Sequence, residues 1–297
     1  MSASEDGTVR LWDIRQKLSA VRLLKIPGVG EVGFCKSSSD LVTVSCGNHL
    51  FGYDLRSSES IIVSAPSFSV RIPEEDDIDD FSFSSSGDLI AVPSDAGEVH
   101  LISSKTFTVQ SSVSVHENIA SVARFLPCGD QIVSGGYDCK IATCRFGSTS
   151  LRADKSFPVA SLIPLDEDSE TVSGQSINPP FVTSMEVSPN AHQLAVGVGD
   201  GSVLVLDLHR GGSRIDTRRI AWGGAQIHPV SVASIAWDER SSSIWSVGND
   251  SVLQKMDANR ISVRYPLGFK PNAVVSFGSD TVAVGGLLNE IEILAFS

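Results

Sequence analysis

The chain has 297 residues, of which 41% are hydrophobic, and a formal net charge of −12. It is long enough to bury a large core, but no stretch approaches the roughly 18 consecutive apolar residues that a membrane-spanning helix needs. The acidic balance excludes the basic stripe on which non-specific nucleic-acid binding depends. Five cysteines, none of them in a Cys-x-x-Cys pair, indicate a reduced protein of the cytoplasm or nucleus.

Short β-rich runs, each bounded by Gly, Ser, Asp or Asn, recur along the whole chain. In chain order they cover residues 41–46, 49–55, 81–92, 98–104, 119–125, 131–136, 181–188, 193–208, 232–237, 243–250 and 281–286. Strands of about five residues at spacings near ten are typical of an all-β sandwich, barrel or propeller. The length favours the propeller, because single-domain sandwiches are usually much shorter.

A repeating unit supports the propeller. A strand of small residues recurs at 2–4, 133–136, 196–199, 245–248 and 284–286, and an alternating strand follows each time. Between the two strands stands an acidic or amide residue: Asp6, Asp138, Asp200, Asp250 or Asn289. The pattern resembles the WD-repeat family, whose units of about 40–45 residues each form a four-stranded blade.

The resemblance implies one blade at the N-terminus and further blades that start near residues 31, 78, 119, 181, 232 and 272. We therefore expect an all-β, seven-bladed WD-repeat β-propeller that forms a single domain over residues 1–297. An acidic insertion at about 163–180 lengthens blade four. The chain starts at the second strand of a blade and ends with "EIEILAFS", which reads as a third strand. Blade one should lack its inner strand and blade seven its outer strand, through either an incomplete N-terminus or imperfect closure.

The position that gives the family its tryptophan is degenerate in this chain. Trp12, Tyr53, Ile102, Cys144, Leu206, Met256 and Leu294 occupy it. In the family this side chain packs between blades and joins a hydrogen-bonded relay of His, Ser or Thr, and Asp. The resemblance implies such relays for His116, Ser134 and Asp138 in blade four, and for His228, Ser246 and Asp250 in blade six. We assign these residues a structural role.

Chemistry-bearing motifs are sparse. The Ser-His-Asp sets lack the strand–turn–helix elbow that exposes a nucleophilic serine. The glycine-rich segments "GGYDCK" and "GVGDG" lack the Gly-Lys-Ser/Thr ending of a phosphate loop, and no metal-ligand spacing is present. The sequence therefore predicts no catalytic residue, no metal and no cofactor.

Two turns carry an arginine two residues after an aspartate. Trp-Asp-Ile-Arg stands at 12–15 and Tyr-Asp-Leu-Arg at 53–56. The first is similar to the signature of WD-repeat substrate receptors for cullin-based ubiquitin ligases. That resemblance implies that Arg15 and Arg56, held by Asp13 and Asp54, face the large propeller adaptor of the ligase. The alternative is that such turns arise in WD repeats without any ligase link.

Two segments concentrate acidic residues. "PEEDDIDD" at 73–80 contains Glu74, Glu75, Asp76, Asp77, Asp79 and Asp80, and "LDEDSE" at 165–170 contains Asp166, Glu167, Asp168 and Glu170. Both join an outer strand to the next inner strand, so they share the face opposite the arginine turns. This acidic face would steer basic partners such as histone tails. The alternative is a pair of solvated loops.

Two functions follow from these observations. The first is a non-enzymatic substrate receptor, whose arginine turns hold the cullin ligase adaptor while the acidic face gathers a basic substrate or histone-like peptide. The second is a ligase-independent WD-repeat scaffold in a chromatin or RNA-processing complex. In both cases the partners are proteins rather than nucleic acid or membrane, and the chain acts as a monomer.

Overall fold

The structure is all-β. The computed structural model describes residues 1–13, 20–27, 32–38, 40–56, 60–73, 77–78, 80–127, 130–147, 150–162, 178–209, 214–258, 260–278, 280–287 and 290–296. Within these residues the strands form seven sheets, and the only helix is a 3₁₀ turn at Val159–Ser161. The expected fold class, all-β with seven blades, is confirmed, and the last blade has only three strands.

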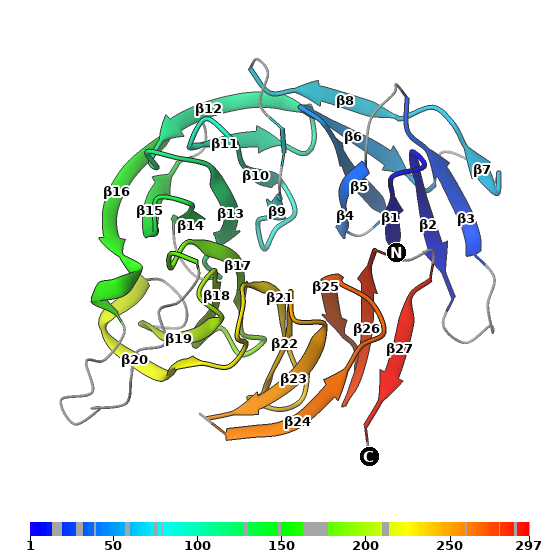
Figure 1. The fold of residues 1–297 in the computed structure, drawn as a ribbon. Coiled ribbons are helices and arrows are strands. Elements are labelled where there is room, and N and C mark those ends of the chain that lie inside the picture. The colour runs from blue at the N-terminus through cyan, green and yellow to red at the C-terminus, as the bar shows by residue number, and fades with distance from the viewer. Residues whose placement is uncertain are drawn as a thin grey trace, which may run out of the picture. The chain divides into compact units, whose positions relative to one another are not determined.

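The chain divides into two compact units, of which the first comprises Met1–Phe125 and Phe146–Ala153. The strands of its sheets are labelled in Figure 1. The first sheet is β1 (Ser2–Ser4), β2 (Thr8–Trp12), β3 (Ala20–Lys25) and β7 (Ile62–Val63). The second is β4 (Val32–Ser38), β5 (Leu41–Cys46), β6 (His49–Asp54) and β8 (Phe68–Arg71). The third is β9 (Ser82–Phe83), β10 (Leu89–Pro93), β11 (Glu98–Ser103) and β12 (Thr108–Ser114).

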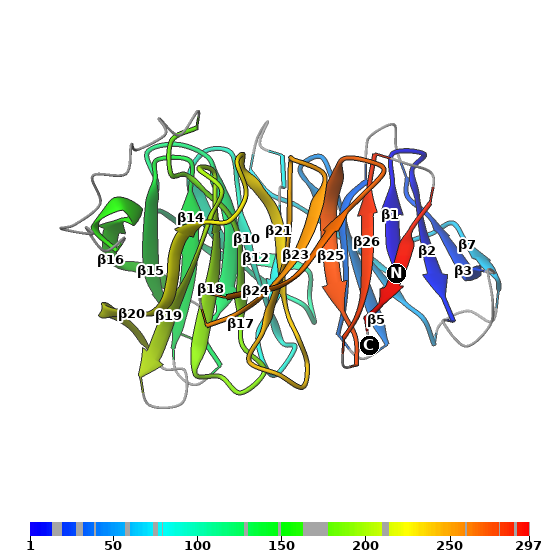
Figure 2. The ribbon, with the colours of Figure 1, turned by 60° about the horizontal axis from the view of Figure 1, so that its bottom comes forward.

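The second unit comprises Leu126–Arg145 and Asp154–Ser297. The residues of the fourth sheet are divided between the two units: β13 (Ala120–Phe125) belongs to the first, β14 (Gln131–Gly136) to the second, and β15 (Lys140–Phe146) and β16 (Leu151–Pro158) to both. The fifth is β17 (Val182–Val187), β18 (Gln193–Val198), β19 (Ser202–His209) and β20 (Arg214–Gln226). The sixth is β21 (Val232–Trp237), β22 (Ile244–Gly248), β23 (Val252–Asp257) and β24 (Arg260–Pro266). The seventh has three strands, β25 (Pro271–Ser276), β26 (Thr281–Gly286) and β27 (Glu292–Ala295), seen from a second side in Figure 2.

The predicted blade starts agree with the first strands of the sheets. Five of them, β4, β13, β17, β21 and β25, begin within one residue of the prediction. Blade three differs, because β9 begins at Ser82 rather than near residue 78. The N–H of Ile78 donates to the carbonyl of Gly47, 3.1 Å away in the turn of the second sheet. That bond draws the segment toward the neighbouring blade, so pairing with β10 starts later.

The first sheet has a fourth strand that the sequence did not predict. The short strand β7 pairs in parallel with β3, with Leu23 opposite Ile62 and Leu24 opposite Val63. It belongs to the segment that leads from β6 to β8. Blade one therefore lacks its inner strand, as expected, and gains a strand at its outer edge. Parallel cover of this kind reduces the exposed edge of β3.

Apolar side chains of adjacent sheets form the core within each unit. Val9 and Leu24 of the first sheet pack with Val42, Val44 and Tyr53 of the second. In the second unit, buried residues of the sixth and seventh sheets form an equivalent cluster: Ala236, Trp245, Val247, Leu253, Leu267, Val274, Val282 and Val284. Because inner strands such as β14 and β22 are buried on both faces, each sheet depends on its neighbours for burial of apolar surface.

Glycine-containing turns hold the start of the following blade. Gly201 has a positive φ of 91° and accepts hydrogen bonds from the N–H groups of Ile227 and His228, at 3.0 and 3.1 Å. A Cβ at this position would lie 1.9 Å from the carbonyl oxygen of His228. Gly97 has the same relation to His116, with an N–H to carbonyl distance of 3.1 Å. Only glycine permits both the left-handed backbone and the close approach.

A buried ion cluster lies among the first strands of the first unit. Asp80, directly before β9, is 6% exposed. Its Oδ1 pairs with the Lys36 ammonium of β4 at 2.7 Å, and its Oδ2 pairs with the Arg124 guanidinium of β13. Burial alone would raise the pKa of Asp80, but Arg124 and Lys36 outweigh burial and hold it below its usual value. Asp80 therefore does not belong to an exposed acidic face.

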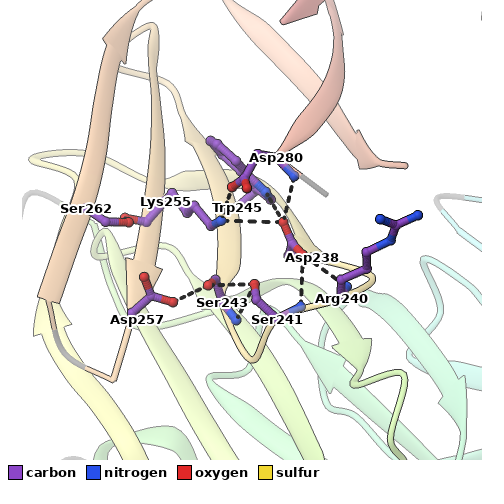
Figure 3. A network of polar contacts seen from close by, with 9 residues as sticks. All are labelled: Asp238, Arg240, Ser241, Ser243, Trp245, Lys255, Asp257, Ser262 and Asp280. Carbon is purple, nitrogen blue, oxygen red and sulfur yellow. Dashed lines mark hydrogen bonds and ion pairs between the residues drawn. The ribbon is translucent and has the colours of Figure 1, made fainter. Parts of the chain in front are cut away.

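A second polar network joins the sixth and seventh sheets (Figure 3). Asp238 Oδ1 accepts the N–H groups of Arg240 and Ser241, both at 3.0 Å. Its Oδ2 accepts the N–H of Asp280 at 3.3 Å and lies 3.5 Å from the Lys255 ammonium. Burial by itself would raise the pKa of Asp238, but the backbone donors outweigh burial and lower the pKa to about 2. One carboxylate thus fixes both its own turn and the turn between β25 and β26.

We predict that Asp80→Ala destabilises the protein by about 3 kcal/mol, because it leaves two cations without their shared carboxylate. Urea denaturation at pH 7 measures the change. Since the folded-state pKa of Asp80 is depressed, its contribution is present above about pH 4 and is lost as the pH falls through the depressed value. The matched control is Asp77→Ala, since Asp77 is exposed and should cost within about 0.5 kcal/mol. Equal effects of the two substitutions would contradict the assignment.

We also predict that Asp238→Ala lowers the free energy of unfolding by about 2–4 kcal/mol, because three N–H donors lose their acceptor. Thermal and urea unfolding report the loss. The wild-type contribution should weaken as the pH falls from about 4 toward 2, the pKa of Asp238. Asp88→Ala is the control, because Asp88 only forms a surface pair with Lys105 at 2.8 Å, worth at most about 1 kcal/mol. A loss no larger than that of the control would show that the network is not a joint between the sheets.

Candidate protein-interaction site

The turn after β6 presents an arginine that is oriented by an aspartate. Asp54 Oδ1 accepts the backbone N–H of Arg56 at 3.0 Å and its Nε at 2.9 Å, and Oδ2 accepts Nη2 at 2.8 Å. The Arg56 side chain is 72% exposed. Asp40 lies 3.8 Å from Nε and adds a second negative charge. The guanidinium is thus held in one direction while its outer edge faces solvent.

The charges of this pair are mutually stabilised. The side-chain hydrogen bond with Arg56, with help from the Arg56 N–H, lowers the pKa of Asp54 to about 2. The same side-chain hydrogen bond raises the pKa of Arg56 above its usual value. Both groups are therefore fully charged at neutral pH. A planar, oriented guanidinium of this kind suits bidentate bonds to a carboxylate or to backbone carbonyls of a partner.

The first sheet supports the same turn. Arg22 of β3 donates from Nη1 to the carbonyl of Leu55 at 2.8 Å. The N–H of Leu55 donates to the carbonyl of Asp40 at 2.9 Å. Bonds from two directions fix the backbone next to Arg56. The turn is therefore rigid before any partner binds, which reduces the entropy lost on association.

Exposed apolar side chains lie on the segments that hold this turn. Ile61 is 69% exposed, Ile62 is 54% exposed, and Val21 of β3 is 44% exposed. The N–H of Leu23 donates to the Ile61 carbonyl at 2.8 Å, which places these residues on adjacent backbone. Val21 precedes Arg22, whose guanidinium holds the Leu55 carbonyl, and we use the name Arg56 surface for Arg56 together with Val21, Ile61 and Ile62 of these flanking segments. Exposed apolar groups beside a charged rim are common at protein–protein interfaces.

The first arginine turn is described only in part. Asp13 follows β2 and is half-buried, whereas Arg15 lies outside the described residues. The adjacent Trp12 is 39% exposed, and its Nε1 donates to Ser2 Oγ at 2.9 Å. The family tryptophan of the first blade thus ties β2 to β1.

Only part of the predicted acidic face lies within the described residues. Asp77 is exposed, whereas Asp80 is buried in the ion cluster with Lys36 and Arg124. Glu74, Glu75, Asp76 and Asp79 lie outside the described residues, as do Asp166, Glu167, Asp168 and Glu170. The two partners of Asp80 were not predicted from the sequence. Both occupy the fifth position of a first strand, Lys36 in β4 and Arg124 in β13, so alignment of the repeats could have found them.

The predicted relay of blade six forms. His228 Nδ1 lies 2.9 and 3.1 Å from the two carboxylate oxygens of Asp250, and Nε2 lies 3.0 Å from Ser246 Oγ. His228 and Ser246 are fully buried. Burial lowers the pKa of His228, and Asp250 opposes that effect only in part. A serine sealed in this way cannot reach a substrate, so the relay joins strands. In blade four, His116 and Ser134 are likewise buried.

Among the residues that the structure describes, none forms a helix with the length and hydrophobicity of a membrane span. The described residues also contain no group of three or more His, Cys, Asp or Glu side chains that could hold a metal ion.

Comparison with known proteins agrees with this architecture. The family described as "WD domain, G-beta repeat" matches residues 1–13 and 107–142. The first match ends on Trp12 and Asp13, and the second contains His116, Ser134 and Asp138.

A curated relative, WD repeat-containing protein 53 homolog of Dictyostelium discoideum, is 26% identical over 216 residues. The alignment covers 70% of this chain and 58% of the relative, so the chain spans less than two thirds of the relative's length. The matched segments, this relative and the seven sheets together agree with the resemblance seen in the sequence: the chain is similar to WD-repeat β-propellers, an architecture that generally serves as a non-enzymatic scaffold for protein interactions.

Proposed function

We propose that this chain is a substrate receptor that links the propeller adaptor of a cullin ubiquitin ligase to a target protein. The observation that carries the proposal is the Arg56 surface. Its guanidinium is oriented by Asp54 and yet 72% exposed. Most exposed arginines lose side-chain entropy when they bind, whereas this one is already ordered. Arg15, which follows Asp13 in the corresponding turn of blade one, is the second proposed contact.

The chemistry of the Arg56 surface defines what the adaptor must offer. Nε and Nη2 of Arg56 already donate to Asp54. The adaptor must therefore offer a carboxylate or a pair of carbonyl oxygens to the N–H groups on the outer edge of the guanidinium. Val21, Ile61 and Ile62 require an apolar patch beside that acceptor. An interface that buries the apolar residues would also exclude water from the charged pair, which strengthens it.

The target is proposed to be basic. Asp77 is exposed, and the chain carries a net charge of −12. A field of this sign raises the association rate of a Lys/Arg-rich segment, such as a histone-like peptide. Glu74, Glu75, Asp76 and Asp79 are proposed to extend the acidic face around Asp77. We further propose that residues 1–297 act as one domain and as a monomer, in the cytoplasm or nucleus.

The second candidate is a ligase-independent scaffold in a chromatin or RNA-processing complex. One observation favours it. The backbone N–H of Arg56 donates to Asp54 at 3.0 Å, which is a local aspartate turn that caps a strand without any partner. In this view the Asp-x-Arg pattern stabilises the turn after a third strand. Binding and stability measurements on the same variants separate the two functions.

We predict that Arg15→Ala/Arg56→Ala abolishes co-purification of the propeller adaptor and a cullin from cells while the melting temperature stays unchanged. Loss of a charge-assisted bond at an interface costs about 2–5 kcal/mol of binding when the partner group is left unpaired. An exposed arginine costs only about 0.5 kcal/mol of stability. Affinity purification with mass spectrometry and thermal melting are the two measurements.

The matched control is Arg71→Ala. Arg71 is an exposed arginine of the same sheet, but it pairs with His49 at the start of β6 and thus lies at the other end of the sheet from Arg56. It should retain the adaptor. Arg56→Lys keeps the charge without the planar fork and should bind weakly. A folded double variant that still retains the adaptor would contradict the proposed contacts. Recovery of another stable complex without adaptor or cullin would support the scaffold.

A further inference from the structure

A pocket lies at one end of the sixth and seventh sheets, remote in sequence from the Arg56 surface. It has a volume of about 260 Å³ and is lined by Ala233, Asn249, Lys270, Pro271, Asn272 and Leu287. Ala233 and Pro271 stand at the start of the first strands β21 and β25. Asn249 and Leu287 follow the second strands β22 and β26. We call these six residues the Lys270 pocket.

The walls of the Lys270 pocket are held by backbone hydrogen bonds. The N–H of Leu287 donates to the Lys270 carbonyl at 3.0 Å, and the N–H of Asn249 donates to the Ser231 carbonyl at 2.9 Å. A Cβ on Gly286 would lie 2.2 Å from the Lys270 carbonyl oxygen, so this close approach requires glycine. The buried His228–Asp250 contact fixes the residue next to Asn249. The pocket is therefore built before a ligand arrives.

The polar groups of the pocket have bonding capacity left over. Within the part of the chain that the structure describes, no carboxylate pairs with the Lys270 ammonium, and the Asn249 and Asn272 amides make no side-chain hydrogen bond. Lys270, Asn249 and Asn272 are all exposed. The cation calls for an anionic partner, and each amide offers one donor group and one acceptor, as a peptide unit does.

The remaining lining is apolar. Leu287 is 63% exposed, and Ala233 and Pro271 contribute small apolar surfaces. The volume is below the roughly 300–1,000 Å³ of small-molecule sites. It suits one or two side chains of a polypeptide better than a whole cofactor. An extended segment can place an acidic side chain on Lys270, its peptide groups on the two amides and an apolar side chain on Leu287.

We propose that the Lys270 pocket binds an extended segment of a partner protein in which an acidic residue stands beside an apolar one. This site is independent of the ligase proposal, because it uses residues of the second unit and a ligand of opposite charge to the basic target. It gives the scaffold a second, chemically distinct specificity.

The test is fluorescence anisotropy with the full chain and two labelled probes, the capped peptides Ala-Leu-Glu-Leu-Ala and Ala-Leu-Gln-Leu-Ala. The Glu peptide should bind about threefold to fivefold more tightly, the gain expected from an exposed ion pair. Lys270→Gln should remove this preference, and Lys270→Arg should keep it. Asn272→Ala and Leu287→Ser should weaken both peptides.

Lys25→Gln is the matched control, because Lys25 is also exposed and lies on β3 of the first unit. It should leave both affinities unchanged, as should Arg56→Ala, which separates this site from the adaptor contact. Equal binding of the two peptides, or a preference that survives Lys270→Gln, would overturn the proposal. Displacement of the Glu peptide by millimolar inorganic phosphate would also overturn it, in favour of a general anion site. Thermal melts of each variant confirm that these exposed substitutions leave the fold intact.

Discussion

Burial of each sheet against the next is the constraint on which the rest of this structure depends. A four-stranded sheet satisfies its inner backbone groups by pairing, but it cannot cover its own apolar faces. Val9 and Leu24 of the first sheet are fully buried only because Val42, Val44 and Tyr53 of the second lie against them. Trp245 of the sixth sheet is fully buried in a cluster with Val282 and Val284 of the seventh. Neighbouring repeats therefore stabilise one another.

Polar residues at the ends of the strands use the same neighbour relation. Asp80 is buried because Lys36 and Arg124 come from the first strands of the sheets on either side of it. Asp238 is buried because Lys255 and the N–H of Asp280 satisfy it from its own sheet and the next. A buried carboxylate is tolerated only with such partners. These contacts fix the order of the sheets more specifically than apolar packing does.

Charged residues that do not join neighbouring sheets are available to bind a partner. Arg56 is oriented by Asp54 but keeps its outer edge exposed, and Lys270 has no carboxylate partner among the described residues. Both lie at turns whose backbone is tied to a neighbouring segment. The proposed surfaces differ in charge partners and in accompanying apolar groups. The architecture thus supplies rigid turns, and the side chains at those turns supply specificity.

The repeat pattern by itself determined the fold class, the number of blades and most strand starts. Alternating strands and small-residue turns report local backbone preference and apolar patterning, which a sequence carries directly. It also identified the His228–Asp250 contact, because the relay recurs at fixed positions in the repeat. Only the tertiary structure decided that Asp80 is buried, that β7 pairs with β3, and that six separate residues form the Lys270 pocket. Each of these depends on contacts between segments far apart in the chain, and no local pattern in the sequence encodes which segments meet.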